Sequence, residues 1–203
     1  MLSRFTVVRG FLKTLKQFFF RFFKIRPEEF VLVQLLFLFF TTIGMLFTLG
    51  AASGDALLLS RFGKDSEKML PFVYLGIAFS SLFMTFFYDR IQSRFKRKPL
   101  LMGVFLLLSL SILLLRLSFC LVDSDFLYVF LVVWLETCSL LSMMLFFSFC
   151  GDYFTAVDAR RVYGYLAGGL PLGTILAGFL LKPLALKAGT LNVLFAAAVF
   201  QGL

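Results

Sequence analysis

Long apolar runs separated by short polar gaps make up the chain from residue 30 onward. Six such runs are recognisable, at 30–54, 69–88, 99–115, 126–150, 162–181 and 190–203. A helix needs about 20 residues to cross the hydrocarbon core of a bilayer, and backbone groups in lipid must form hydrogen bonds within their own segment. The first five runs are close to that length, so the pattern predicts membrane-spanning helices. The sixth is shorter and is predicted to be an incomplete span.

Composition strengthens the membrane interpretation. Charged residues make up 15% of the chain and the mean hydropathy is +0.97, whereas about a quarter of the residues of a soluble domain are charged. The net charge of +9 is typical of nucleic-acid-binding proteins, but the basic residues lie in the gaps between apolar runs, so no nucleic-acid partner is expected. The predicted fold class is all-α: a polytopic membrane protein of about six transmembrane helices in one bundle (30–203).

Residues 1–29 precede this bundle and are the most basic stretch of the chain. Apolar residues recur there in steps of three and four, at Phe5, Val8, Leu12, Leu15, Phe19 and Phe22. The basic residues lie largely off that stripe, a pattern typical of an amphipathic helix on a membrane surface. A solvated, partly disordered tail is the alternative.

The distribution of Lys and Arg predicts the orientation. Fourteen of the 20 basic residues fall in the N-terminal arm and in the gaps 89–98 and 151–161, and six fall in the alternate gaps. Cytoplasmic loops carry the excess of basic residues. The N terminus and the loop 89–98 are therefore predicted to be cytoplasmic, with the protein in the cell (inner) membrane.

The reactive residue types argue against catalysis. The chain has three cysteines and no histidine, and Cys138 and Cys150 are about 18 Å apart on one helix, too far for a disulfide. With no histidine and no CxxC pair, neither a metal site nor a nucleophile–base pair is expected. We expect no cofactor and no enzymatic activity.

Glu136 is the single acid inside a predicted span. A charge at the bilayer centre costs roughly 2.5 kcal/mol or more, and such residues usually face a cavity or a partner. The functional interpretation is substrate or proton coupling. The alternative is a protonated carboxyl group that is hydrogen-bonded to a neighbouring helix.

Two stretches resemble known transporters. In the loop 89–98, an acid followed by basic residues (Asp89, Arg90, Arg97, Lys98) resembles the loop between helices two and three of the major facilitator superfamily, in which such residues form a charge network. A plain positively charged loop is the alternative interpretation. The order of residues after Glu136, namely Asp152, Asp158, Arg160 and Arg161, looks like helix four and the following loop of the nucleotide exchange transporters, the ATP/ADP translocases.

Asp55 belongs to the same resemblance. It lies in the stretch SGDALLLSRFG, where related sequences have a basic residue directly before the aspartate and this chain has Gly54. The basic residue of the family is implicated in substrate recognition. The resemblance thus implies a substrate-binding or coupling role for Asp55 and Glu136, with nucleotides and other anionic metabolites as alternative substrates.

The run 162–181 and its flanks are rich in small residues and contain a proline. Gly164, Gly168, Gly169, Pro171 and Gly173 predict close helix packing and a kinked helix, which suits a transporter that changes conformation.

The predicted function is that of the N-terminal half of a secondary transporter working by alternating access. Its expected partners are the lipid bilayer, a small-molecule substrate, and either a second six-helix half or another copy of the chain. A truncated or non-transporting membrane scaffold is the alternative.

Overall fold

The chain folds into a bundle of long helices. The computed structural model describes residues 28–92, 97–121 and 124–202. The predicted amphipathic segment, apart from Glu28 and Glu29, and the loop at 93–96 therefore lie outside the described residues. Within them nearly all residues are helical and no strand occurs, so the all-α prediction is confirmed.

Two helices connected by a tight turn open the bundle, and two more lie beside them. Helix α2 (Phe30–Phe62) runs into the 3-10 turn η1 (Gly63–Asp65) and returns as α3 (Ser66–Gln92), and α4 (Arg97–Leu121) and α5 (Asp125–Tyr153) follow. Gly63 ends α2 with φ +52°, a left-handed conformation that glycine adopts without strain. Each helix is longer than the apolar run that predicted it, because backbone hydrogen bonds continue into the polar flanks.

The predicted span 162–181 consists of parts of two helices. The short helix α6 (Ala156–Leu166) ends before Gly168, and α7 (Gly169–Ala188) starts directly after it. In a continuous helix, Pro171 would lack the N–H for the carbonyl of Ala167, and its ring would clash there. In the first turn of α7, no such bond is needed. The break therefore takes the place of the predicted kink. Helix α8 (Thr190–Gly202) follows a turn at Gly189, whose φ is +83°.

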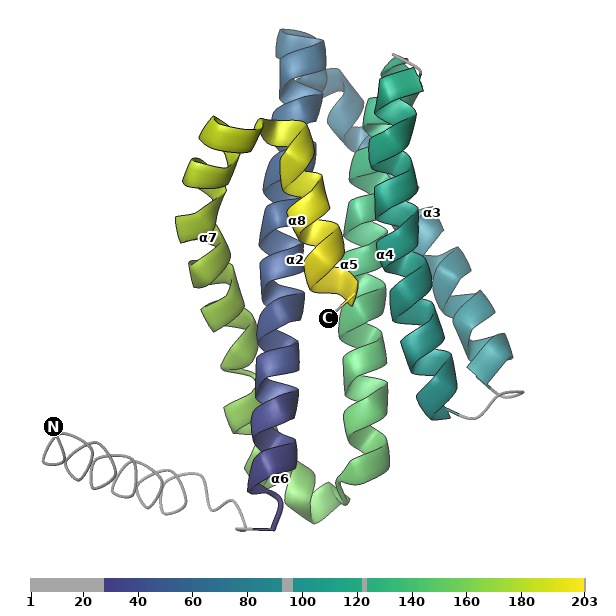
Figure 1. Cartoon of the computed structure of the whole chain (residues 1–203). Helices are drawn as coiled ribbons and strands as arrows, with labels where there is room; N and C mark the ends of the chain where they lie inside the picture. Colours follow the sequence, from purple (N-terminus) through teal and green to yellow (C-terminus); the bar gives the residue numbers. More distant parts are fainter. Residues whose placement is uncertain (1–27, 93–96, 122–123, 203) are drawn as a thin grey trace, which may run out of the picture.

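Among the described residues, four apolar helical stretches are long enough to cross a membrane: Phe30–Ile91, Pro99–Phe119, Asp125–Tyr153 and Val157–Lys187. The first contains both α2 and α3, which run antiparallel in Figure 1. Helix α8, with 13 residues, is not among them. The chain is thus a membrane protein by length and composition, whereas the predicted count of six spans is not confirmed.

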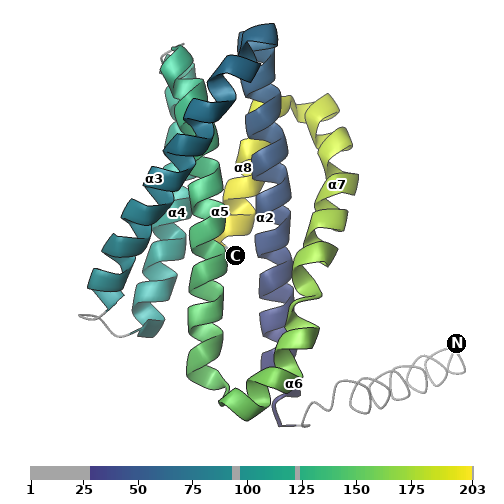
Figure 2. The ribbon, with the colours of Figure 1, turned by 180° about the vertical axis from the view of Figure 1, so that it is seen from behind.

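The helices form two layers. Viewed from behind, α3, α5, α2 and α7 lie side by side in the front layer, with α4 and α8 in the layer behind them (Figure 2). The largest buried cluster lies between the layers and includes Leu49 of α2, Ile112 of α4, Leu131 of α5 and Leu194 of α8. A second cluster, around the stacked rings of Phe40 and Phe146, fixes α2 against α5 and α6. The layer containing α4 and α8 thus covers one side of the α2–α5 pair.

A few polar contacts join the helices at membrane depth. The Trp134 indole donates to Ser111 Oγ over 2.8 Å, which ties α5 to α4. The Ser109 hydroxyl donates to the Ala198 carbonyl over 2.8 Å, which ties α4 to α8. Such bonds are worth about 0.6–1 kcal/mol in membranes, a modest value because the same groups also find partners when the helices are apart.

The orientation stays a prediction that two single-cysteine variants test. We expect Lys64→Cys, in η1, to react with a membrane-impermeant maleimide added to intact cells. Ser93→Cys, in the gap between α3 and α4, should react only after the cells are opened, because the excess of basic residues places that loop in the cytoplasm. Both variants are made in a background without the native cysteines. The reverse labelling pattern would contradict the orientation.

Candidate functional site

Glycines on α2 allow α5 to approach it closely. A Cβ added at Gly54 would lie 3.3 Å from a Val132 methyl and 3.5 Å from a Leu135 methyl, and one at Gly50 would lie 3.8 Å from Leu135. Small residues at such contacts bring membrane helices into van der Waals packing. Gly54 and Leu135 therefore mark where the two helices face each other.

Asp55 directly follows Gly54, and Glu136 directly follows Leu135. One position turns a side chain by about 100° around the helix axis. Because α2 and α5 run in opposite directions (Figure 2), this step turns both side chains toward the same side of the pair. The two carboxyl groups are close enough for their charges to interact. Residues 81 positions apart thus meet on one face.

We call this side of the α2–α5 pair the acidic face. Side chains four and seven positions from each acid lie on the same side of a helix. The acidic face therefore comprises Thr48, Ala51, Asp55, Glu136, Leu140 and Met143. Asp55, Leu140 and Met143 are exposed, and Glu136 is partly buried. Leu57 and Cys138, each two positions or about 200° after an acid, belong to the buried cluster between the layers. The acidic face is therefore on the opposite side of the α2–α5 pair, away from α4 and α8, and is flanked by α3 and α7, which lie on either side of this pair in Figure 2.

No ion pair joins either acid to a basic residue within the described parts of the chain. Arg61, six positions after Asp55, instead binds the start of α5. Its Nε lies 2.7 Å from Asp125 Oδ1, and its guanidinium lies over the Tyr128 ring at 5.5 Å from the centroid. In the described part of the bundle, the acidic face therefore presents two carboxyl groups without a neutralising basic side chain.

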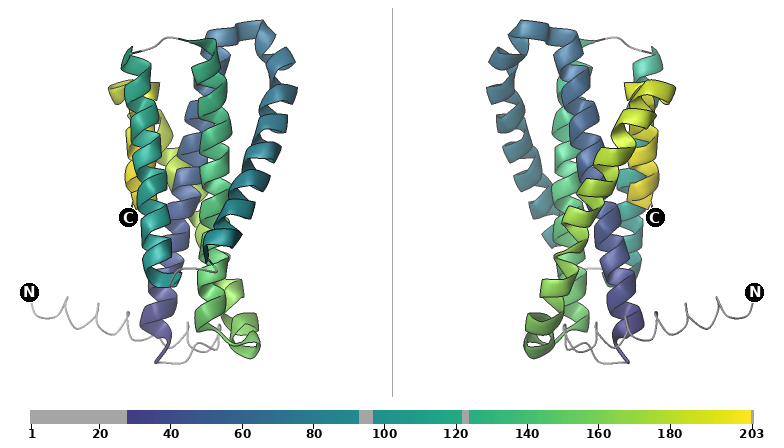
Figure 3. Two further views of the ribbon diagram at one scale, coloured as in Figure 1. Left: turned by 90° about the vertical axis from the view of Figure 1, so that its right-hand side faces the viewer. Right: turned by 90° about the vertical axis from the view of Figure 1, so that its left-hand side faces the viewer.

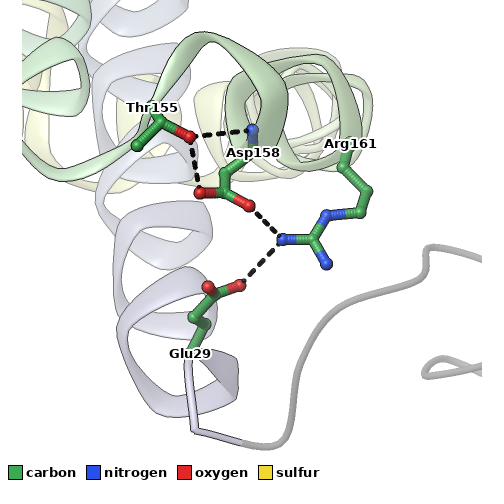
Figure 4. A network of polar contacts seen from close by, with 4 residues as sticks. All are labelled: Glu29, Thr155, Asp158 and Arg161. Atoms are coloured by element: carbon green, nitrogen blue, oxygen red, sulfur yellow. Dashed lines mark hydrogen bonds and ion pairs between the residues drawn. The ribbon is translucent and has the colours of Figure 1, made fainter.

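A second polar cluster joins the start of α2 to α6 (Figure 4). The Thr155 side chain caps α6, accepting from the Asp158 backbone N–H at 3.3 Å and donating to the Asp158 carboxylate at 2.7 Å. Arg161 Nη2 then lies 2.7 Å from Asp158 Oδ1 and 3.2 Å from Glu29 Oε2. These side chains are about four-fifths buried, so solvent screens their ion pairs less than on an open surface.

Two members of the predicted charge network belong to this cluster. Asp158 and Arg161 are in contact, and the additional partner is Glu29, which sequence reasoning missed. In the sequence, Glu29 is notable only as an acid directly before the first span. No local pattern indicates that it contacts Arg161, which lies 132 positions later. The other predicted members are placed as follows: Asp89, Arg90, Asp152 and Arg160 are exposed, and the side chains of Arg97 and Lys98 lie outside the description.

The predicted small residues separate into two groups. Gly169 and Gly173 lie directly against α2, where a Cβ at Gly169 would be 2.9 Å from the Phe37 carbonyl oxygen and one at Gly173 would overlap the Thr41 carbonyl. Gly44 of α2 faces the Leu170 carbonyl in the same way. By contrast, Gly164 has open space at its Cβ position. Gly168 contacts its own turn, and Pro171 is exposed.

Comparison with family models, with curated proteins and with solved structures found no match to this chain. The likeness to the major facilitator superfamily and to the nucleotide exchangers thus stays a prediction from the quoted motifs.

Proposed function

We propose that this chain is one helical bundle of a solute transporter, in which the acidic face lines the path of the transported solute or coupling ion. The observation that supports this most is the position of Asp55 and Glu136. They are distant in sequence, meet at membrane depth and share the uncovered side of the bundle. Membrane carboxylates are costly to insert and usually face a cavity or a partner.

The arrangement of helices supports the same proposal. Secondary transporters bind substrate near the midplane, between two bundles that move against each other. Here α4 and α8 cover one side of the α2–α5 pair (Figure 2), and the acidic face is on the side opposite the buried Leu57 and Cys138. A second bundle, either a further half or another copy of this chain, is expected to cover it, because lipid is a poor environment for two carboxyl groups.

The charge of the acidic face bears on the substrate. Two carboxyl groups favour a proton or a cationic group and disfavour phosphate, which is bound by Arg and Lys. Gly54 occupies the position at which the nucleotide exchangers have a basic residue. Binding of a nucleotide would therefore need basic residues from the second bundle, and a cation-coupled solute fits this bundle better.

Cysteine accessibility tests the proposal without knowledge of the substrate. In a background without native cysteines, Leu140→Cys and Met143→Cys should react with a charged, water-soluble maleimide in native membranes, because a transport path contains water. Phe179→Cys and Leu106→Cys are the controls, since these exposed side chains lie on α7 and α4 and would face lipid. Equal lack of reaction at all four positions would contradict a transport path and favour a non-transporting scaffold.

A further inference from the structure

Helix α3 is the more loosely packed of the two helices that flank the acidic face. It packs mainly against α5 and lies at one edge of the bundle (Figure 3). Among its described residues, the only buried apolar side chains are Val73 and Tyr88, and none of the residues 74–87 is buried. By contrast, α7 on the other flank lies directly against the α2 backbone at Gly169 and Gly173. The two flanks of the acidic face are therefore held differently.

A close contact fixes α3 near the η1 turn. A Cβ added at Gly76 would lie 3.0 Å from a Val133 methyl group, and Val73 packs with Leu58 and Val132. These contacts hold the first part of α3 against α2 and α5. Gly76 has no side chain to restrict its backbone, so the helix bends more easily there than at its other residues. Gly76 is therefore the expected pivot for the rest of the helix.

Beyond this pivot, weak polar contacts join α3 to α5. The hydroxyl group of Ser80 shares a hydrogen bond over 3.0 Å with that of Thr137, the residue directly after Glu136. Further along, the Thr85 hydroxyl lies 3.9 Å from the Met144 sulfur, which is a weak acceptor. Apolar contacts add little specific attraction, because lipid chains replace them when helices separate. Among the described residues, the Ser80–Thr137 bond is thus the strongest specific contact between α5 and this part of α3.

We propose that the part of α3 beyond Gly76 is a movable side wall of the acidic face, which swings away from α5 when the Ser80–Thr137 bond opens. A bond of this kind changes an equilibrium by a factor of only about three to five, so it can open and close readily. Because Thr137 directly follows Glu136, the movement changes the access of water and solute to Glu136. This inference rests on the proposed function for what the movement serves, whereas the movement itself is measured without transport.

Distances between two spin labels on the full chain in lipid nanodiscs test the movement. The labels are attached to Phe86→Cys on α3 and Ile175→Cys on α7, two exposed positions, in a background without the native cysteines. We expect two distances, one for the packed and one for the displaced position of the wall. Ser80→Ala removes the bond and should raise the ratio of displaced to packed chains about three- to fivefold.

Ser81→Ala is the matched control, a neighbouring serine with the same substitution. The Ser81 hydroxyl donates to the Ala78 carbonyl of its own helix over 3.0 Å, so its loss should leave both populations unchanged. Thr137→Val removes the helix–helix bond from the other side, and S80A/T137V should therefore shift the populations no further than S80A alone. A single distance in the labelled chain without these substitutions, or equal shifts for S80A and S81A, would overturn the proposal.

Maleimide labelling of Leu140→Cys separates this inference from the proposed function. Leu140 is on the acidic face, about one turn after Thr137. If the wall controls access, S80A should raise the labelling rate about three- to fivefold, and S81A should leave it unchanged. Labelling at one rate in all three chains would overturn the role of the wall and leave the transport path supported. No labelling in any of them would contradict the transport path, and the spin-label distances would then decide whether the wall moves.

Discussion

Gly173→Ala is expected to destabilise the bundle more than any other addition of one methyl group to α7. The new Cβ would overlap the Thr41 carbonyl and would also lie 2.9 Å from the Met45 backbone nitrogen. These are main-chain atoms of α2 that no rotamer change can move, so the helices must separate. Overpacking of this kind costs about 1–3 kcal/mol or more, and we expect the upper end of that range. Thermal unfolding in detergent, followed by circular dichroism, measures the loss.

Gly178→Ala is the matched control for this prediction. Gly178 is on the same helix, but a Cβ there meets nothing within 4 Å. Alanine is a better helix former than glycine by up to about 1 kcal/mol, so this variant should be as stable as the unmodified chain or more stable. If both variants unfold at the same temperature, the close α2–α7 contact is not what holds α7 in place.

Glu136→Gln is expected to separate function from stability. Glutamine keeps the shape of the side chain and removes a charge that costs roughly 2.5 kcal/mol at the bilayer centre. The variant should therefore insert and fold at least as well as the unmodified chain. If Glu136 contacts a cationic solute or coupling ion, the loss of a charged contact worth about 1.5–3 kcal/mol should weaken uptake roughly ten- to a hundredfold.

The measurement pairs uptake into proteoliposomes with thermal stability of the same preparation. Asp55→Asn should behave like Glu136→Gln, because the two carboxyl groups are on one face and interact. Asp65→Asn removes an acid in η1 that pairs with Lys68, away from the acidic face, and should leave uptake unchanged. A Glu136→Gln chain that loses stability but keeps transport would contradict the coupling role and favour a structural hydrogen bond.

Local features of the sequence determined which segments are helical. The apolar runs are long enough to span a bilayer, and lipid leaves the backbone no hydrogen-bond partner outside its own segment. Thr155 and Asp158 likewise determine where α6 begins, because a capping side chain acts on N–H groups within three positions. Helix α2 nevertheless continues past Asp55 to Phe62, beyond the predicted end at residue 54, since a carboxylate on an open face does not interrupt the backbone ladder.

The tertiary structure alone decided which of these local features act together. Gly173 and Gly178 are the same residue type, five positions apart on α7. Only Gly173 lies against α2, because the two positions are on different sides of the helix, one facing the bundle and the other facing away from it. In the same way, Glu29 became the partner of Arg161, and Asp55 and Glu136 came to share one face. Composition and local pattern limit which helices form, whereas contacts between positions far apart depend on the rotation and direction of helices packed together.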